Sequence, residues 1–252
     1  MRVAVIGGTG LVGRQTVAAL EAKGHDPVAV SRKTGVDVTT GAGLDAALAG
    51  VAAVIDVVSY ESADRAEAER FFAAETENLL AAEQRAGVGH HVLLSIVGVD
   101  AVEGNAHYAG KRIQQAMVSD GATPWTIVAA TQFFDFAVMV VEWTRTGDTA
   151  VVPPLLVQPI AVADVADILA EVAVGRPLGR AVEVAGPDTH DLVDMARRTL
   201  TARGEECRLV ASWRDSPLGV EMAGDVLLPG DGARIAPTTF ETWLAAQSRN
   251  GG

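Results

Sequence analysis

Short apolar runs alternate with longer amphipathic segments along most of the chain. Residues 3–6 form a continuous apolar run, as in a strand buried on both faces, whereas residues 11–23 repeat apolar side chains at helical spacing. Strands that alternate with helices indicate parallel β-α-β units. Beyond that first run, we expect strands over residues 27–31, 36–38, 51–58, 91–96, 125–129, 150–152, 155–160 and 181–185, and helices over 11–23, 43–49, 63–85, 107–119, 162–174 and 191–203.

The pattern becomes less regular after about residue 150, and the chain closes with residues 235–246, in which Thr238 is a plausible helix cap before Phe240. We therefore predict a doubly wound parallel sheet, a Rossmann-type α/β fold, with a small C-terminal α/β cap. The core should span residues 1–152. Residues 153–252 should form a substrate-covering part that packs on the core as one unit.

Glycines interrupt the chain where the first strand meets the first helix. They are Gly7, Gly10 and Gly13, and they suit a dinucleotide diphosphate lying almost on the backbone at a helix N-terminus. Gly7 permits the sharp exit from the strand, Gly10 leaves room for the phosphates, and Gly13 lets the helix pack closely. The expected contacts in this turn are Gly7, Thr9, Gly10, Leu11 and Val12.

The spacing Gly7-x-x-Gly10-x-x-Gly13 resembles the fingerprint of the extended and atypical short-chain dehydrogenase/reductase families, including the NmrA-like and isoflavone-reductase-like branches. The resemblance in outline covers nearly the whole chain. It implies an NAD(P)-binding core over 1–152. It also implies that Asp37 and Val38, after the third predicted strand, lie near the adenine.

Two cations follow the second predicted strand, in the segment Ser31, Arg32 and Lys33. An acidic residue at this place would bind the 2′-hydroxyl of NAD, whereas a basic pair neutralises the 2′-phosphate of NADP. The segment therefore favours NADP, with NAD possible. Ligands of open α/β sheets bind at the carboxyl ends of strands, so we also expect Val57, Val58 and Ser59 to pass beneath the cofactor.

The segment His107-Tyr108-Ala109-Gly110-Lys111 opens a predicted helix. The resembled reductases place a tyrosine four residues before a lysine that binds the nicotinamide ribose and lowers the tyrosine pKa. Here His107 occupies that register and Tyr108 lies one position later. Either ring can share a helix face with Lys111, so His107 or Tyr108 is the candidate acid or base, unless neither acts and Lys111 only holds the ribose.

The resemblance assigns two further places to the site. Ser95, at the end of a predicted strand, corresponds to the serine or threonine that binds the substrate carbonyl, although a strand-end serine also commonly bonds backbone. The segment after the strand at 125–129 runs beside the nicotinamide in these families and opens the substrate pocket. It supplies Ala130 to the cofactor and Thr131, Gln132, Phe133 and Phe134 to the substrate.

Composition limits the possible partners. The formal net charge of −12 argues against extended contact with nucleic acid, and no apolar run approaches the roughly 20 residues that span a bilayer. The first strand begins directly after Met1, so we expect a cytoplasmic protein without a membrane anchor. His90 and His91 point to opposite faces of a strand, so we expect no metal site.

These features favour an NADP-preferring oxidoreductase that reduces a small, largely apolar carbonyl, enone or quinone by hydride transfer. Two alternatives stay open. One is a non-catalytic NADP-binding redox sensor or regulator, which the displaced tyrosine would suit. The other is an isomerase, cyclase or epimerase that reuses the same pocket. The long helices are also compatible with a homo-oligomer.

Overall fold

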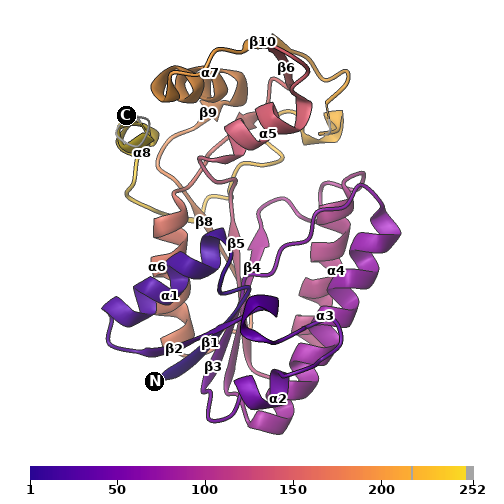
Figure 1. The fold of residues 1–252 in the computed structure, drawn as a ribbon, viewed down its shortest axis with the longest axis vertical. Coiled ribbons are helices and arrows are strands. Elements are labelled where there is room, and N and C mark those ends of the chain that lie inside the picture. The colour runs from indigo at the N-terminus through magenta and orange to yellow at the C-terminus, as the bar shows by residue number, and fades with distance from the viewer. Residues whose placement is uncertain (217, 248–252) are drawn as a thin grey trace. The chain divides into compact units, whose positions relative to one another are not determined.

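The computed structural model describes residues 1–216 and 218–247 and contains a seven-stranded sheet in the order β2-β1-β3-β4-β5-β8-β11 (Figure 1). The registered pairs of this sheet, β1 with β2 and β3, β3 with β4, and β8 with β11, are all parallel. The predicted Rossmann-like α/β fold is confirmed. The strands are β1 (Arg2–Ile6), β2 (Asp26–Val30), β3 (Ala53–Asp56), β4 (His90–Ile96), β5 (Trp125–Ala130), β8 (Ala181–Ala185) and β11 (Arg234–Ile235).

Helices flank this sheet on both faces (Figure 1). On one face, α1 and α6 pack against each other, and Lys23 Nζ lies 2.6 Å from Asp167 Oδ1 between them. On the other face, α3 and α4 form the corresponding pair. The bounds are α1 (Leu11–Ala22), α2 (Leu44–Ala47), α3 (Arg65–Ala86), α4 (Ala106–Asp120) and α6 (Val162–Val174).

Side-chain caps fix where α3 and α4 begin. The Asp64 carboxylate accepts from the Glu67 N–H, and the Asn105 side chain accepts from the Tyr108 N–H at 3.1 Å. Each cap satisfies a backbone donor that a helix N-terminus leaves unpaired. The cap at Asn105 places His107, Tyr108 and Lys111 in the first two turns of α4.

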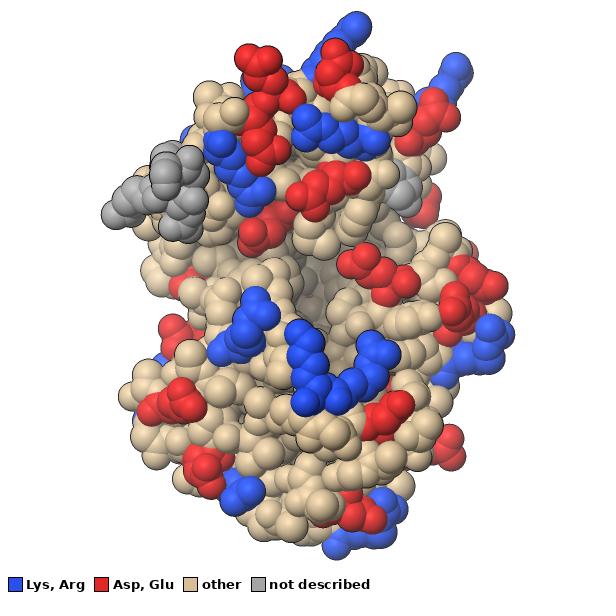
Figure 2. Space-filling view, in the orientation of Figure 1, with Lys and Arg blue, Asp and Glu red and all other residues tan. Residues whose placement is uncertain are grey.

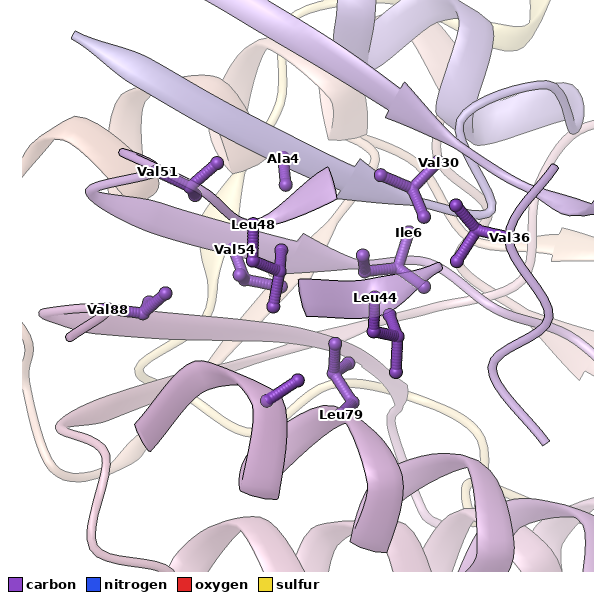
Figure 3. Close-up of a cluster of buried hydrophobic side chains, with 11 residues drawn as sticks. Ala4, Ile6, Val30, Val36, Leu44, Leu48, Val51, Val54, Leu79 and Val88 are labelled. Carbon is purple, nitrogen blue, oxygen red and sulfur yellow. The ribbon is translucent and has the colours of Figure 1, made fainter. Parts of the chain in front are cut away.

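A buried cluster of aliphatic side chains joins α2 and α3 to the sheet. Figure 3 shows Leu44 and Leu79 directed toward Ile6 and Val54, and all four are fully buried. Burying a side chain of this size contributes about 1.5–3 kcal/mol. The cluster therefore holds the strand ends of β1 and β3 in fixed positions.

The predicted strand over residues 36–38 is wrong. Asp37 Oδ1 accepts from the Thr39 N–H at 2.9 Å and from Thr39 Oγ1 at 2.7 Å, and Asp37 forms only an isolated bridge with Ala42. An aspartate that bonds the backbone two residues on favours a turn over a strand. Two valines around Asp37 suggested a strand, but the turn leaves β2 as the edge of the sheet.

The chain packs into two compact units, each built from separate stretches. The first contains residues 1–100, 105–129 and 162–182, and the second contains 101–104, 130–161 and 183–252. The sequence division at residue 152 stays a prediction, and residues 248–252 of its C-terminal part lie outside the described residues. Outside the seven-stranded sheet, the elements of the second unit include α5 (Phe136–Thr144), β6 (Thr149–Val152), β7 (Leu156–Val157), β9 (His190–Asp191), α7 (Leu192–Arg203), β10 (Arg208–Ala211) and α8 (Phe240–Gln247).

In the second unit, β6 pairs with β10 in parallel and β7 pairs with β9 in the antiparallel sense. Two short 3₁₀ turns, Arg32–Thr34 and Val220–Met222, complete the elements described.

Figure 2 shows acidic and basic side chains interspersed over the face that it presents. None of the helices in the described part of the chain combines the length and apolar composition needed to cross a bilayer.

Candidate active site

The glycine turn connects β1 to α1 through close backbone contacts. Gly7 adopts a left-handed φ of 80°, and the N–H groups of Gly7 and Gly8 both donate to the Val30 carbonyl, at 2.9 and 3.2 Å. A Cβ at Gly13 would lie 2.1 Å from the Gly7 oxygen, closer than any real contact. Only glycine therefore allows the first turn of α1 to pack on the loop.

The space beside Gly10 suits an anionic group. A Cβ at Gly10 would meet only the Gly7 oxygen, at 3.2 Å, so the rest of its surroundings are open. Gly10 is the N-cap of α1, whose first turn contains no acidic side chain. Because the first amides of a helix lack internal partners and carry the positive end of its dipole, the residues present fit a diphosphate.

The segment after β2 presents two cations. Arg32 and Lys33 are exposed and lie in a 3₁₀ turn that is closed by a 2.9 Å hydrogen bond from the Ser31 N–H to Thr34 Oγ1. Within residues 1–216 and 218–247, neither cation has an acidic group at ion-pair distance. Hydrogen bonds from Thr39 lower the pKa of the nearby Asp37 carboxyl.

Lys111 is buried, with 4% of its surface exposed. Its Nζ donates to the carbonyls of Val58 (3.1 Å) and Leu94 (3.0 Å) and to the Gln114 Oε1 (2.8 Å). These three bonds use all the donors of an ammonium group. Burial lowers the pKa of Lys111, while the charges of Asp56 and Glu75 oppose that shift. Lys111 thus ties α4 to the carboxyl ends of β3 and β4.

Gln114 extends this contact into a buried polar network. Its Nε2 donates to Asp56 Oδ2 at 2.6 Å and to Glu75 Oε2 at 3.0 Å, and all three residues are fully buried. Burial, together with the charge of Asp56, raises the pKa of Glu75 well above its ordinary value. A neutral Glu75 leaves Asp56 and Lys111 as a balanced pair of opposite charges.

His107 lies in the first turn of α4 with a defined hydrogen bond. Its Nδ1 is 3.1 Å from the carbonyl oxygen of Tyr60, and its ring packs edge-on against Phe72 at 5.7 Å. A carbonyl only accepts, so Nδ1 carries the proton and Nε2 of the neutral ring is an acceptor. Burial, followed by the charge of Lys111, lowers the pKa of His107 to about 4.

The other candidate residues of this site are Tyr108, Lys111 and Ser95. Tyr108 is buried and directly follows His107, whereas Lys111 Nζ and the His107 ring both lie against Phe72. Ser95 is buried at the end of β4, next to the Leu94 carbonyl that Lys111 contacts. Its Oγ has no hydrogen-bond partner among the residues described. The ends of β3 and β4 therefore bring Val58, Ser95 and Lys111 together.

The predicted substrate segment belongs to the second unit. Thr131 Oγ1 donates to the Gln158 carbonyl at 2.6 Å, and the Gln132 carbonyl accepts from the Ile160 N–H at 2.9 Å. Phe134 is buried and packs with Phe240 and Trp243, each at a centroid distance of 5.6 Å. This packing gives Phe134 a structural role. The contacts of Thr131, Gln132, Phe133 and Phe134 with a substrate, and of Ala130 with a cofactor, stay predictions.

The adjacent histidines of β4 have separate partners. His90 Nε2 lies 2.9 Å from Thr126 Oγ1, and His91 Nδ1 lies 2.7 Å from Glu83 Oε1. This arrangement agrees with their expected opposite directions. In the described part of the chain, no three His, Cys, Asp or Glu side chains are arranged to hold a metal ion.

Sequence reasoning missed the partners of Lys111 and His107. Two features of the sequence indicated the partners of Lys111. Asp56 is a carboxylate inside an apolar strand, and Gln114 follows Lys111 by three residues, a spacing that places both on one helix face. Glu75 follows Phe72 by three residues on the same buried face of α3. No local signal connected Tyr60 to His107, because that contact joins residues 47 positions apart.

The N-terminal part of the chain matches the model of a known protein family. Residues 3–121 match the model of the NAD dependent epimerase/dehydratase family. No curated protein matches the chain by sequence. The structure is similar to dTDP-4-dehydrorhamnose reductase from Bacillus anthracis in complex with NADP, with a TM-score of 0.77, 16% identity, and coverage of 100% of this chain and 99% of that one.

Two further solved structures extend the comparison. A short-chain dehydrogenase/reductase superfamily protein from Agrobacterium tumefaciens with bound NAD has a TM-score of 0.70 and 17% identity, covering 99% of this chain and 97% of its own. UDP-glucose 4-epimerase from Thermus thermophilus, in complex with NAD, has a TM-score of 0.73 and 17% identity over 100% of both chains. At such identities the likeness concerns the fold.

The chain therefore has a Rossmann-type fold similar to that of these NAD(P)-binding proteins, as the sequence predicted, and its residues 3–121 match the model of the NAD dependent epimerase/dehydratase family.

Proposed function

We propose that the chain is an NADP-preferring oxidoreductase that transfers hydride between the nicotinamide and a small, largely apolar carbonyl, enone or quinone substrate. One observation carries this proposal. The glycine turn donates two hydrogen bonds to Val30, and the exposed cations Arg32 and Lys33 follow that residue almost at once. A diphosphate site and a 2′-phosphate site would then lie side by side.

In this proposal, different residues of the first unit bind different parts of the cofactor. Backbone groups of Gly7, Thr9, Gly10, Leu11 and Val12 would hold the diphosphate, and Ser31, Arg32 and Lys33 the 2′-phosphate. Val57, Val58 and Ser59 would lie beneath the cofactor, with Asp37 and Val38 near the adenine. When bound, the nicotinamide supplies or accepts the hydride. The similar reductase from Bacillus anthracis contains NADP, which is in keeping with this assignment.

Lys111 would contact the nicotinamide ribose only by exchanging one of its three protein acceptors. The Val58 carbonyl, at 3.1 Å, is the most distant of them, and Val58 is itself a proposed neighbour of the cofactor. Exchange of one acceptor for a ribose hydroxyl would leave Lys111 satisfied. We propose this arrangement for the loaded site.

Ser95 and the start of α4 would serve the substrate. The Ser95 hydroxyl is buried and has no protein partner among the residues described, so a hydrogen bond to a substrate carbonyl oxygen would satisfy it. His107 or Tyr108 would handle the proton. In the second unit, Thr131, Gln132, Phe133 and Phe134 stay predicted substrate contacts.

Nucleotide titration tests the proposal. NADPH and NADH are titrated against the wild-type chain, Arg32→Glu and, as a control, Arg85→Glu, which reverses an exposed charge on α3. We expect wild type to prefer NADPH and Arg32→Glu to bind it at least about tenfold more weakly, equal to about 1.4 kcal/mol. Equal affinities of the two variants would refute the cofactor assignment.

A redox-neutral reaction is the second candidate, because the neutral His107 ring offers an acceptor for a substrate proton and residues 3–121 match an epimerase/dehydratase model. Net consumption of NADPH during turnover would identify a reductase. Turnover without net consumption would identify an epimerase or isomerase. Tight binding with no turnover over a carbonyl and quinone panel would instead support a redox sensor.

A further inference from the structure

The segment that faces His107 is clamped by a single carboxylate. Tyr60 donates its phenol to Glu67 Oε1 at 2.6 Å, and Ser62 donates its hydroxyl to Glu67 Oε2 at 2.6 Å. Both bonds are short because the acceptor is ionised. The Tyr60 ring also stacks on Phe71 with its centroid 4.1 Å away and an angle of 9° between the planes. Glu67 therefore holds the loop from Tyr60 to Ser62 at both ends.

Glu67 is itself fixed at the start of α3. Its backbone N–H donates to the Asp64 capping carboxylate at 3.1 Å, and the Asp64 N–H donates to Ser62 Oγ at 3.0 Å. The cap, the loop and the carboxylate thus form one closed set of hydrogen bonds. The hydrogen bonds from Ser62 and Tyr60 lower the pKa of Glu67, so the carboxylate stays ionised in this role.

This clamp determines which ring nitrogen of His107 carries the proton. The Tyr60 carbonyl accepts from Nδ1 at 3.1 Å, so Nε2 is the acceptor of the neutral ring, and Nε2 makes no hydrogen bond to a described residue. The hydrogen bond made by one imidazole nitrogen sets the state of the other. The edge of Phe72 limits the rotation of the ring from the α3 side.

We propose that Glu67 is a positioning residue for His107, holding it through the Tyr60 carbonyl in the tautomer whose Nε2 accepts the hydroxyl proton of an alcohol substrate. This inference rests on the proposed function, and it assigns His107 rather than Tyr108 to the proton. In alcohol oxidation by bound NADP⁺, the carbon–hydrogen electron pair leaves as hydride to the nicotinamide. The hydroxyl proton goes to Nε2, and the product is the carbonyl compound.

The resulting imidazolium keeps its Nδ1–H on the Tyr60 carbonyl, so the clamp serves both protonation states. The charged group that acts on the ring is Lys111, on the same helix, and its positive charge disfavours the imidazolium. His107 would therefore release the proton readily to solvent. Carbonyl reduction by the reverse path needs the imidazolium and should be fastest at low pH.

Nitrogen NMR of the imidazole tests the positioning role without any cofactor. In ¹⁵N-labelled wild type at neutral pH, we expect the His107 ring to show a protonated Nδ1 and an unprotonated Nε2. In Glu67→Ala, the released loop should give a mixture of both tautomers. Glu67→Gln, which can still bind both Tyr60 and Ser62, should restore the wild-type pattern. Glu69→Ala is the control, since Glu69 pairs with Arg65 on the same helix.

Kinetics with an alcohol substrate and NADP⁺ provide the second readout. Glu67→Ala should lower kcat for oxidation at least about tenfold and leave NADP⁺ affinity unchanged, and Glu67→Gln should recover most of the loss. A protonated Nε2 in wild type, or an unchanged tautomer in Glu67→Ala, would overturn the proposal. If wild type binds no nucleotide, the proposed function fails, and the NMR result still decides whether Glu67 positions His107.

Discussion

Gln114 accepts a hydrogen bond of 2.8 Å from the Lys111 ammonium and, through its other amide atom, donates to the Asp56 carboxylate at 2.6 Å. The amide thus separates a buried cation from a buried anion and satisfies both. Since a buried charge that loses its partner is costly, while a complete network is not, this one side chain should determine whether the ends of β3, β4 and α4 stay together.

Replacing Gln114 by leucine tests this dependence. Gln114→Leu keeps the size of the side chain but leaves Lys111 and Asp56 each without one partner, so we expect the free energy of unfolding to fall by about 3 kcal/mol. Chemical denaturation at neutral pH measures the change. Gln115→Leu makes the same replacement at the next, partly exposed position and should change stability by less than about 0.5 kcal/mol. Equal effects of the two variants would contradict the network role.

The raised pKa of Glu75 makes stability depend on pH. A carboxyl whose pKa is raised by folding contributes fully below its unfolded pKa, and that contribution is lost as the pH rises from about 4.5 toward the folded pKa. Glu75→Gln keeps a neutral polar group in place. We expect wild type to lose stability relative to Glu75→Gln as the pH rises from 5 to 8.

Denaturation curves of the two proteins across this range provide the measurement, and their difference isolates Glu75 from groups that titrate in both. Asp56→Asn is the matched comparison, because it removes the charge that balances Lys111. It should destabilise the protein at neutral pH by about 3 kcal/mol. Parallel pH profiles for wild type and Glu75→Gln would show that Glu75 is ionised in the folded chain.

Much of the fold follows from local sequence signals. The glycine spacing predicted the turn before α1 because the close contacts of Gly10 and Gly13 are with Gly7 and Gly8, their near neighbours in the chain. The cations Arg32 and Lys33 were identifiable from their place after β2. The strand predicted at 36–38 failed because the Asp37 side chain bonds Thr39 and turns the backbone. A prediction from the hydrophobic pattern alone does not take into account that a side chain can bond the backbone and so compete with strand pairing.

The candidate site was predictable only in part. The register of His107 and Tyr108 against Lys111 is a property of one helix, so it could be stated from spacing. The hydrogen bond of the His107 ring depends on Tyr60, in a loop that precedes α3, and spacing within α4 does not predict it. Likewise, the hydrogen bonds that link Lys111 through Gln114 to Asp56 join α4 to the end of β3, and their formation depends on the whole fold.

The protonation of His107 gives a direct spectroscopic prediction. Its pKa is lowered to about 4, so a pH titration of the His107 ring resonances should show a midpoint near pH 4. Folding lowers the pKa of His107 from its value of about 6.5 in the unfolded chain. The neutral His107 ring therefore contributes fully to the stability of the fold above pH 6.5, and this contribution is lost as the pH falls through 4. Lys111→Met removes the nearby positive charge and should move the midpoint upward. A wild-type midpoint at 6 or above would contradict the burial of the ring.

Gly110 allows the close approach of α3 and α4 on which His107 and Lys111 both depend. A Cβ at this position would lie 2.3 Å from Cδ2 of Phe72, the ring that contacts both side chains. We expect Gly110→Ala to displace Phe72 and to lower the free energy of unfolding by about 1–3 kcal/mol, in the range of other overpacked cores. Gly89→Ala is the control, because its Cβ would meet only the Ala52 carbonyl at 3.6 Å.

If displacement of Phe72 matters to the site, Gly110→Ala should also move the His107 titration midpoint, whereas Gly89→Ala should leave it in place. Wild-type stability and an unchanged midpoint in Gly110→Ala would show that the two helices can separate without disturbing the site.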